Sequence, residues 1–276
     1  MKIEVKDIYF TFDKNLLTES KALQSISTSF EKKELVSIIG ESSSGKTVFI
    51  EHLNALRKPQ KGFLNIDGTI VKKFKKLKRI NEIRTKVGVV FQFAEYQLFK
   101  SKIIDDVMFG PLSMKVGKIE SRKRAEKYLN LVGIEKYFYQ KSPFELSGGQ
   151  KRRVAIAGIL AMEPKFLIFD EPTGGLDPEG EKEMYKLFKK LISLGKNVIV
   201  VTSNMDHALE HSTRSLVLKK GKIIYDGDTK KLFYEKNLFE MGLIKPKIIN
   251  FLEKTNIKTK EYPTNIDELV KILKKG

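Results

Sequence analysis

Residues 35–47 read Leu-Val-Ser-Ile-Ile-Gly-Glu-Ser-Ser-Ser-Gly-Lys-Thr, and they combine an apolar run with a glycine-containing loop. Its first five residues form a short, mainly apolar run, which is typical of a strand buried on both faces of a parallel sheet. The next eight match G-x-x-x-x-G-K-[ST], and a helical pattern continues through Leu56. In such a loop, small residues let backbone N–H groups turn inward around phosphate oxygens, and the helix adds its positive N-terminal end. The stretch therefore predicts a phosphate-binding loop between a strand and a helix.

The last two residues of this loop indicate which ligand it binds. Lys46 can bring a positive charge to β- and γ-phosphates, and the Thr47 hydroxyl can ligate Mg²⁺, so the expected cofactors are ATP and Mg²⁺. An accidental match to the pattern should occur in roughly one chain of this size in a hundred. The strand–loop–helix setting lowers that rate further. The residues expected to bind ATP here are Gly40, Glu41, Ser42, Ser43, Ser44, Gly45, Lys46 and Thr47.

Further short apolar runs alternate with helical patterns along the chain, which predicts an α/β fold with a doubly wound parallel sheet. The clearest apolar stripe lies within Met184–Leu191, on a helix that should end near Gly195. Apolar and polar residues alternate over Ile8–Phe12, as in an antiparallel edge sheet. Residues 100–145 are mainly helical, and a Lys-rich helical appendage begins after about residue 230. The apolar runs are Val87–Phe91, Phe166–Phe169 and Val198–Val201.

Two further motifs carry chemistry. The run that ends at Phe169 is followed by Asp170 and Glu171. The first carboxylate could hold Mg²⁺ and the second could activate a water molecule. Alternatively, the two acids simply start a turn, since Pro172 follows. Leu146–Gln150 opens a predicted helix with Ser147 as a good N-cap and two glycines that expose backbone N–H groups. A chain with one phosphate loop has no internal use for this second anion site, so we expect it to serve another subunit's nucleotide.

The composition combines an ordinary globular balance with a strong excess of positive charge. Lys and Arg number 52 against 34 Asp and Glu, a net charge of +18. This charge suggests nucleic acid or an anionic membrane surface as a partner. Only eight of the basic residues are Arg, however, and the lysines are scattered. We therefore expect no nucleic-acid partner, and a solvated face for the densest basic run, Lys72–Arg79.

Three features favour the cytoplasm. The chain has no cysteine, its first seven residues carry charges where a signal peptide would be apolar, and no apolar run reaches the ~18 residues of a membrane span.

Taken in order, the motifs resemble the nucleotide-binding subunits of ATP-binding cassette (ABC) transporters over residues 1–230. The resemblance implies a P-loop parallel core sheet, an antiparallel edge sheet and a helical subdomain at about 93–160. It also implies that two subunits pack head to tail, with each ATP between one chain's phosphate loop and the other's signature helix. Besides the loop, it assigns ATP contacts to Phe12, Ser147, Gly148, Gly149, Gln150 and Asp177, Mg²⁺ to Thr47, Gln92 and Asp170, and catalysis to Glu171, Lys46, Gln92 and the position of Ser203.

A narrower resemblance is to the ATPases of energy-coupling factor (ECF) transporters, which drive uptake of vitamins and transition-metal ions. It rests on Val90–Phe99 and on Phe144–Gly158, while Pro143–Leu146 and Asp170–Thr173 are similar to the second of the two ATPase types that pair in these transporters. This implies a heterodimer with a related cassette, a transmembrane scaffold subunit and a substrate-binding membrane subunit, at the cytoplasmic face of the cell membrane. Residues 231–276 would be a helical dimerisation appendage.

Two residues depart from the family pattern. Ser43 stands where the phosphate loop usually has Gly, which would cost some strain if its φ is positive. Ser203 stands where the family has a histidine that contacts the γ-phosphate, and none of His52, His207 and His211 aligns with that position. We therefore expect the site built on this chain's own loop to hydrolyse ATP slowly.

Other functions stay open at this point. The chain could serve another importer or exporter, or be a soluble cassette ATPase that acts on ribosomes or DNA. It could also bind ATP only as a structural clamp.

Overall fold

A computed structural model of the chain describes residues 1–13, 16–31, 33–73, 80–255, 257, 259 and 261–274. The chain forms two compact units: unit 1 comprises Met1–Lys75 and Ile199–Gly276, and unit 2 comprises Lys76–Val198. Residues 74–79 of the basic run, and residues 275 and 276 of the expected helical appendage, lie outside the described residues. The domain boundaries expected near residues 93, 160 and 230 remain predictions.

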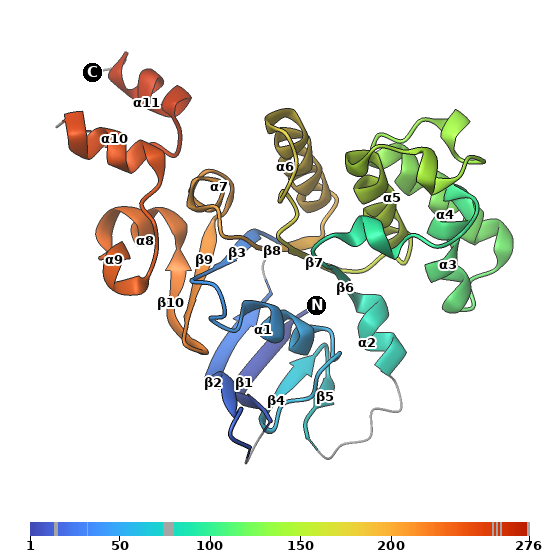
Figure 1. Ribbon diagram of the computed structural model, residues 1–276, viewed down its shortest axis with the longest axis horizontal. Coiled ribbons are helices and arrows are strands. Elements are labelled where there is room, and N and C mark those ends of the chain that lie inside the picture. The colour runs from blue at the N-terminus through green and yellow to red at the C-terminus, as the bar shows by residue number, and fades with distance from the viewer. Residues whose placement is uncertain are drawn as a thin grey trace. The chain divides into compact units, whose positions relative to one another are not determined.

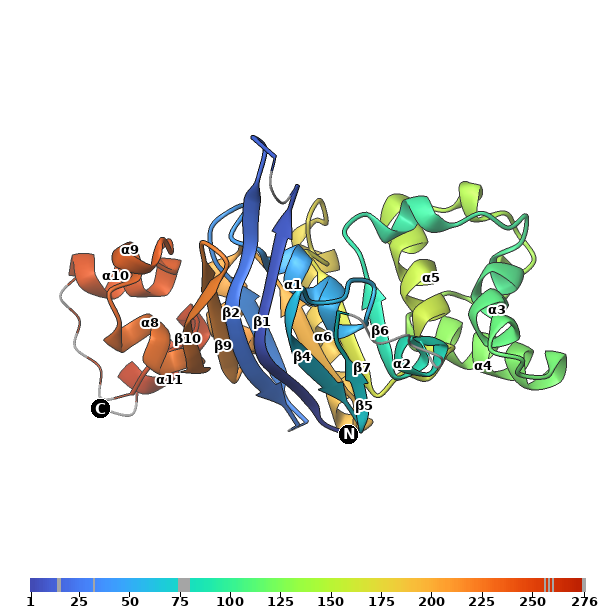
Figure 2. The ribbon, with the colours of Figure 1, turned by 90° about the horizontal axis from the view of Figure 1, so that it is seen from below.

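Unit 1 contains an antiparallel sheet of four strands in the order β2-β1-β4-β5 (Figure 2). The inward side chains of β1, Ile3, Val5 and Ile8, are buried, and β1 pairs antiparallel with both β2 and β4. The alternation expected over Ile8–Phe12 is therefore confirmed as an antiparallel sheet. The strands are β1 Ile3–Phe12, β2 Ser20–Phe30, β4 Lys61–Ile66 and β5 Thr69–Val71.

A second group of strands in unit 1 leads into the phosphate loop. They lie in the order β10-β9-β3, with β3 parallel to β9 and β10 antiparallel to β9. All five residues of β3 are buried, as its apolar sequence predicts. The strands are β3 Leu35–Ile39, β9 Arg214–Lys219 and β10 Lys222–Asp228, and the helices that follow β3 and precede β9 are α1 Lys46–Leu53 and α7 Met205–His211.

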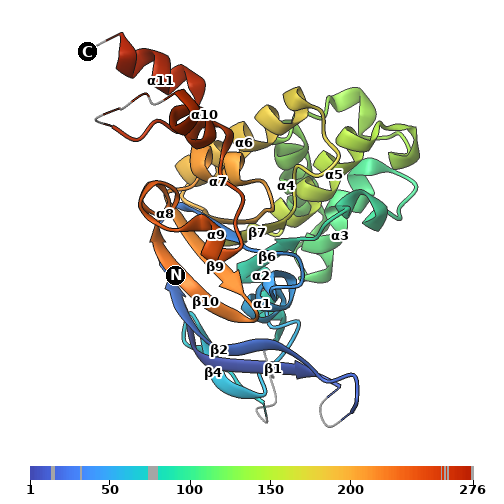
Figure 3. The same cartoon turned by 60° about the vertical axis from the view of Figure 1, so that its left-hand side comes forward.

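The chain ends in four helices, called here the C-terminal helices, which belong to unit 1. The first of them, α8, packs on β9 and β10 (Figure 1), and α10 and α11 lie side by side (Figure 3). A continuous apolar cluster joins residues from all four helices to α7, Val217 and Ile39. The helices are α8 Thr229–Glu235, α9 Leu238–Met241, α10 Lys247–Thr255 and α11 Ile266–Leu273.

Unit 2 combines a parallel strand pair with a helical region. Strands β6 and β7 pair in parallel, with Val87 opposite Phe166, and both are fully buried. Helices α3, α4 and α5 pack on one another, which confirms the helical character expected over residues 100–145. The elements are α2 Ile80–Lys86, β6 Val87–Val90, the 3-10 turn η1 Ala94–Gln97, α3 Ile103–Ser113, α4 Lys118–Leu131, η2 Lys136–Phe138, η3 Pro143–Glu145, α5 Gly148–Leu160, β7 Phe166–Asp170 and α6 Pro178–Ser193.

The remaining strand, β8 Asn197–Val201, is fully buried, and its residues are divided between the two units. The helix that was expected to end near Gly195 is α6, which ends at Ser193. Gly195, two residues later, has a left-handed φ of 82°. Within the described residues, none of the helices has the length and apolarity that crossing a bilayer requires.

Candidate nucleotide site

The predicted site residues fall in both units. Unit 1 holds Phe12, the loop 40–47 and Ser203, and unit 2 holds Gln92, the signature residues 147–150 and the acidic residues. The structure groups several of them within each unit.

The loop between β3 and α1 has the backbone that a phosphate cradle requires. Lys46 extends back over the loop, where its Nζ donates to the carbonyl oxygens of Gly40 and Glu41, both at 2.8 Å. The two glycines are required by space as well as by conformation. A Cβ on Gly40 would lie 2.1 Å from the Leu218 carbonyl oxygen, and one on Gly45 would lie 2.4 Å from that of Ala22. The loop geometry thus depends on both Gly residues of the motif.

Ser43, which replaces the usual glycine of the loop, has the positive φ that was expected to cost strain. Its φ is 60°, in the left-handed region that glycine occupies without penalty. A non-glycine residue held there costs on the order of 1 kcal/mol. The next residue, Ser44, is anchored: Gly221 N donates to its carbonyl oxygen at 3.0 Å, its own N donates to the Glu41 carbonyl oxygen at 3.2 Å, and the residue is buried.

Phe12 lies at the end of β1 in a small aromatic cluster. Its ring meets Phe10 edge to face at 5.0 Å, and the Arg57 guanidinium lies 5.0 Å from its centroid. Phe10 in turn packs against His52, which is fully buried and has its Nδ1 2.7 Å from the Val48 carbonyl oxygen. Burial lowers the pKa of His52, so this histidine is a neutral packing residue.

Ser203 lies two residues after the end of β8, where the chain turns into α7. Thr202 N donates to the Ile38 carbonyl oxygen at 3.2 Å, which ties this turn to β3. Asn204 caps α7 by accepting from His207 N at 3.2 Å. The Ser203 side chain is exposed, whereas His207 and His211 are half-buried on α7.

The acidic pair follows β7 in unit 2. Asp170 is the last residue of this strand and is buried, with 6% of its surface exposed. Glu171 has a φ of 45°, an unusual value for a residue with a side chain. Gly174 N donates to its carbonyl oxygen at 3.2 Å and closes the turn. Strained backbone of this kind tends to occur at functional positions, where the surrounding structure holds it in place.

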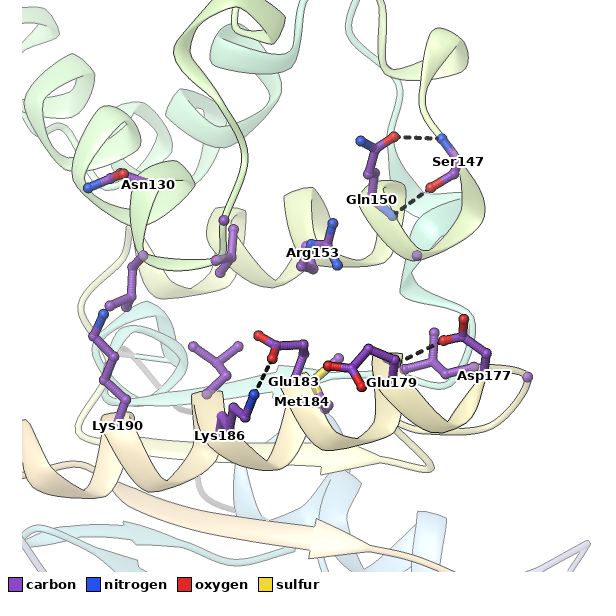
Figure 4. Close-up of a pocket in the computed structure, with 18 residues that line it drawn as sticks. Asn130, Ser147, Gln150, Arg153, Asp177, Glu179, Glu183, Met184, Lys186 and Lys190 are labelled. Atoms are coloured by element: carbon purple, nitrogen blue, oxygen red, sulfur yellow. Dashed lines mark hydrogen bonds and ion pairs between the residues drawn. The ribbon is translucent and has the colours of Figure 1, made fainter.

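The signature residues begin α5 with a complete capping box (Figure 4). Ser147 Oγ accepts from Gln150 N at 3.3 Å, and Gln150 Oε1 accepts from Ser147 N at 3.0 Å. A Cβ on Gly148 would meet no atom within 4 Å, and one on Gly149 would meet only Leu176 at 3.9 Å. Internal packing therefore does not require glycine at either position. The expected N-cap role of Ser147 is confirmed.

Asp177 caps the other helix that borders this region. Its Oδ1 accepts from Gly180 N at 2.8 Å, at the start of α6. Ser147, Gly149 and Asp177 line one pocket of about 830 Å³ between α5 and α6, together with charged side chains that include Arg153, Glu179 and the Glu183–Lys186 ion pair (Figure 4). The structure thus brings Ser147, Gly149, Gln150 and Asp177 to the same pocket.

Arg152 and Glu95 form a link that the sequence did not predict. Arg152 Nη2 and Nε donate to the two Glu95 carboxylate oxygens at 2.7 and 3.1 Å, and Nη1 donates to the carbonyl oxygens of Pro172 at 3.1 Å and Gly174 at 2.7 Å. Burial acts to raise the pKa of Glu95, but the hydrogen bonds and charge of Arg152 outweigh it and lower this pKa. Gln92, exposed and two residues after the end of β6, stands three residues before Glu95. One guanidinium thereby connects the segment after Gln92, the signature helix and the turn after Glu171.

Comparison with known proteins agrees with this arrangement of motifs. Residues 23–174, more than half of the chain, match the family model of the ABC transporters. The energy-coupling factor transporter ATP-binding protein EcfA2 of Mycoplasma mobile is 49% identical over 272 residues, which cover 92% of this chain and 88% of that protein. The chain belongs to the ECF transporter ATP-binding proteins. This membership confirms the predicted ABC-type fold and makes the chain an ABC-type ATPase that binds ATP.

Two solved structures resemble this ECF ATP-binding protein. CbiO1 from Clostridium perfringens, part of the ABC transporter complex cbiONQ, superposes with a TM-score of 0.76 at 32% identity, covering 92% of this chain and 98% of cbiO1. The ATP-binding cassette MJ0796, as a dimer in a post-hydrolysis state with ADP and Pi, superposes with a TM-score of 0.73 at 31% identity, covering 82% of this chain and 98% of MJ0796.

Proposed function

We propose that this chain binds Mg-ATP through the loop 40–47 and hydrolyses it to power uptake by an ECF transporter. The observation that carries the proposal is the loop itself, in which Lys46 is held across the cradle by two carbonyl oxygens at the start of α1. From this position, the Lys46 ammonium group can contact phosphate oxygens with little rearrangement. Phe12, half-buried at the end of β1, offers its ring for stacking on adenine.

The residues proposed to hold Mg²⁺ fit that ion chemically. Thr47, Gln92 and Asp170 supply a hydroxyl, an amide carbonyl and a carboxylate, which are the hard oxygen donors that Mg²⁺ prefers. When bound, the ion would neutralise charge that develops on the phosphates. Glu171 is the proposed general base; it directly follows Asp170, the last residue of β7, and has an unusual φ of 45°.

The signature residues support a role toward a second nucleotide. Two glycines face open space at the N-terminus of α5, where a side chain would fit without steric conflict. Close approach of an external anion to the backbone N–H groups accounts for glycine there, and the head-to-tail pairing implied by the resemblance to ABC transporters would supply one. We therefore assign Ser147, Gly148, Gly149, Gln150 and Asp177 to the ATP of a partner cassette.

The partners follow from the family rather than from this chain alone. EcfA2 of Mycoplasma mobile is named as an ATP-binding protein of an energy-coupling factor transporter, and cbiO1 as part of cbiONQ. By analogy, this chain would pair with a related cassette and dock on a transmembrane scaffold subunit with a substrate-binding membrane subunit. Its place would be the cytoplasmic face of the cell membrane, with residues 231–276 contributing to the cassette contact.

The site on this chain's own loop is proposed to be the slower of the two. Serine at 203 is exposed and shorter than imidazole, and it cannot carry positive charge near the γ-phosphate. Losing one preorganised donor to a transition-state oxyanion costs roughly 10²–10³ in rate. The opposing hypothesis is a cassette that binds ATP only as a clamp and hydrolyses none.

Two measurements test the proposal. Lys46→Ala removes a charge-assisted phosphate contact of ~1.5–3 kcal/mol, so ATP affinity should fall about tenfold or more. Unchanged affinity would overturn the assignment of the loop. Purification of the native complex in mild detergent should yield a second, different cassette together with membrane subunits. Two copies of this chain without another cassette, or co-purification with ribosomes, would contradict the proposed assembly.

A further inference from the structure

Gly242 and Glu41 are in direct contact, although they come from opposite ends of the chain. Gly242 ends α9 with a left-handed φ of 73°. A Cβ at this position would lie 2.1 Å from Glu41 Oε1, 2.6 Å from its Cδ and 2.8 Å from its Cγ. The Glu41 side chain therefore lies along the Gly242 backbone, in space that any other residue would fill.

Glu41 belongs to the phosphate loop by its backbone and touches the C-terminal helices by its side chain. Its carbonyl oxygen is one of the two that hold Lys46 Nζ at 2.8 Å. Its carboxylate is negative, and in a loop that binds a polyanion such a charge opposes binding if it turns toward the phosphates. Contact with Gly242 keeps that carboxylate beside α9.

The C-terminal helices also contact the end of β3, which leads into the loop, and α7, which follows Ser203. Ile39, the last residue of β3, belongs to the apolar cluster that includes Leu238, Leu243 and Ile249. Asp206, three residues after Ser203, accepts from Lys247 N at 2.6 Å at the start of α10. Lys219 Nζ, from β9, donates to the Glu240 carbonyl oxygen at 2.5 Å. The turn between α9 and α10 is thus bonded to the framework of the loop.

We propose that this turn positions the phosphate loop, with Gly242 as the positioning residue and Glu41 as the residue through which it acts. Packing of the C-terminal helices and ATP binding are then coupled, and by linkage each must affect the other equally. The proposal rests on the proposed function of loop 40–47 as the ATP site. It gives the C-terminal helices a role within one chain, distinct from contacts with a second cassette.

The test compares two glycine-to-alanine variants with the same backbone problem. Gly242→Ala introduces a side chain at a left-handed φ and displaces Glu41. Gly68→Ala, in the β4–β5 turn, also introduces a side chain at a left-handed φ, here 85°, but its Cβ would meet no atom within 4 Å and would displace nothing. We expect Gly242→Ala to raise the Kd for ATP about fivefold or more, the lower end of coupling between linked sites, while Gly68→Ala leaves it unchanged. Equal effects of the two variants would overturn the proposal.

A double-mutant cycle identifies Glu41 as the intermediary. Glu41→Ala removes the atoms that Gly242→Ala displaces, so in that background Gly242→Ala should no longer weaken ATP binding. If Gly242→Ala proved equally harmful there, it would act without Glu41 and the proposal would be wrong. Partial relief at raised ionic strength would show that the displaced carboxylate acts through its charge.

Hydrogen exchange tests the coupling even if Gly242→Ala fails to fold. In the unmodified chain, ATP should slow amide exchange in α9 and α10, and Glu41→Ala should abolish this protection. Protection that persists in Glu41→Ala, or that is absent from the unmodified chain, would overturn the proposal. Lys46→Ala distinguishes failure of the proposed ATP site from failure of the proposed coupling. If Lys46→Ala leaves ATP affinity unchanged, loop 40–47 is not the ATP site. If Lys46→Ala lowers ATP affinity but Gly242→Ala has no effect on it, only the coupling is refuted.

Discussion

The Arg152–Glu95 pair gives the most quantitative prediction. The two side chains are only 8% and 13% exposed, and Arg152 also donates to two backbone carbonyl oxygens. Glu95→Gln keeps the shape of the side chain but removes its charge, leaving a buried guanidinium with neutral acceptors. Breaking a buried pair from one side costs roughly 3–5 kcal/mol, and the two retained carbonyl bonds place this case near ~3 kcal/mol.

The matched control is an exposed pair in the same unit. Arg122 and Glu126 form an i,i+4 ion pair on α4 at 2.9 Å, with side chains 56% and 38% exposed. Glu126→Gln should cost only about 0.3–0.5 kcal/mol. In thermal unfolding of the full chain, Glu95→Gln should lower the midpoint by roughly 6 °C or more, against about 1 °C for Glu126→Gln. Equal shifts would refute the view that Arg152 is a structural link.

The same pair has a defined pH dependence. Because the pKa of Glu95 is lowered in the folded state, its stabilising contribution is present above the ordinary value of 4.5 and is lost as pH falls through the folded value. The stability difference between the unmodified chain and Glu95→Gln should therefore be constant from pH 7 to about 5 and shrink below that. A difference that grows on acidification would contradict the assigned direction. Since Arg152 also holds the turn after Glu171, ATPase activity should fall along with stability.

Four further outcomes are expected. In the assembled transporter, Glu171→Gln should reduce steady-state ATPase activity only modestly, whereas Gly149→Asp, which blocks the partner's site, should nearly abolish it; equal damage would contradict unequal sites. Ser203→His should raise turnover, because it restores a γ-phosphate donor. Ser43→Gly relieves a left-handed φ of 60° and should leave ATP affinity equal or higher, so a clear loss would show that the Ser43 side chain itself binds. Burial raises the pKa of Tyr234 to about 12, so stability should fall as pH rises from 10 to 12, measured against Tyr234→Phe, which should lack that decline.

The motifs that the sequence revealed are contiguous. The glycines, Lys46 and Thr47 of the loop 40–47 lie within eight residues. Residues so close in the chain stay close together in any fold, so the sequence alone could predict the site they form. The capping box of Ser147 and Gln150 is equally local, since the first turn of a helix always brings positions three apart together. Fold class was likewise predictable, because a strand buried on both faces, such as Leu35–Ile39, is mainly apolar, with Ser37 its single polar residue. Membership in the ECF ATP-binding proteins then followed from the order of such local motifs.

Contacts between residues far apart in the chain, and unusual backbone angles, became known only from the tertiary structure. Nothing in the spacing of Glu95 and Arg152, 57 positions apart, distinguishes them from the many other charged residues. The contact between Glu41 and Gly242 was equally invisible, because a glycine at the end of a short helix is explained by its left-handed φ alone. The positive φ of Glu171 is set by the turn that surrounds it, not by a preference of glutamate. Motifs made of adjacent residues can therefore be recognised in the sequence. Coupling between segments cannot, because it arises only when packing brings residues that are distant in the chain within a few ångströms of one another.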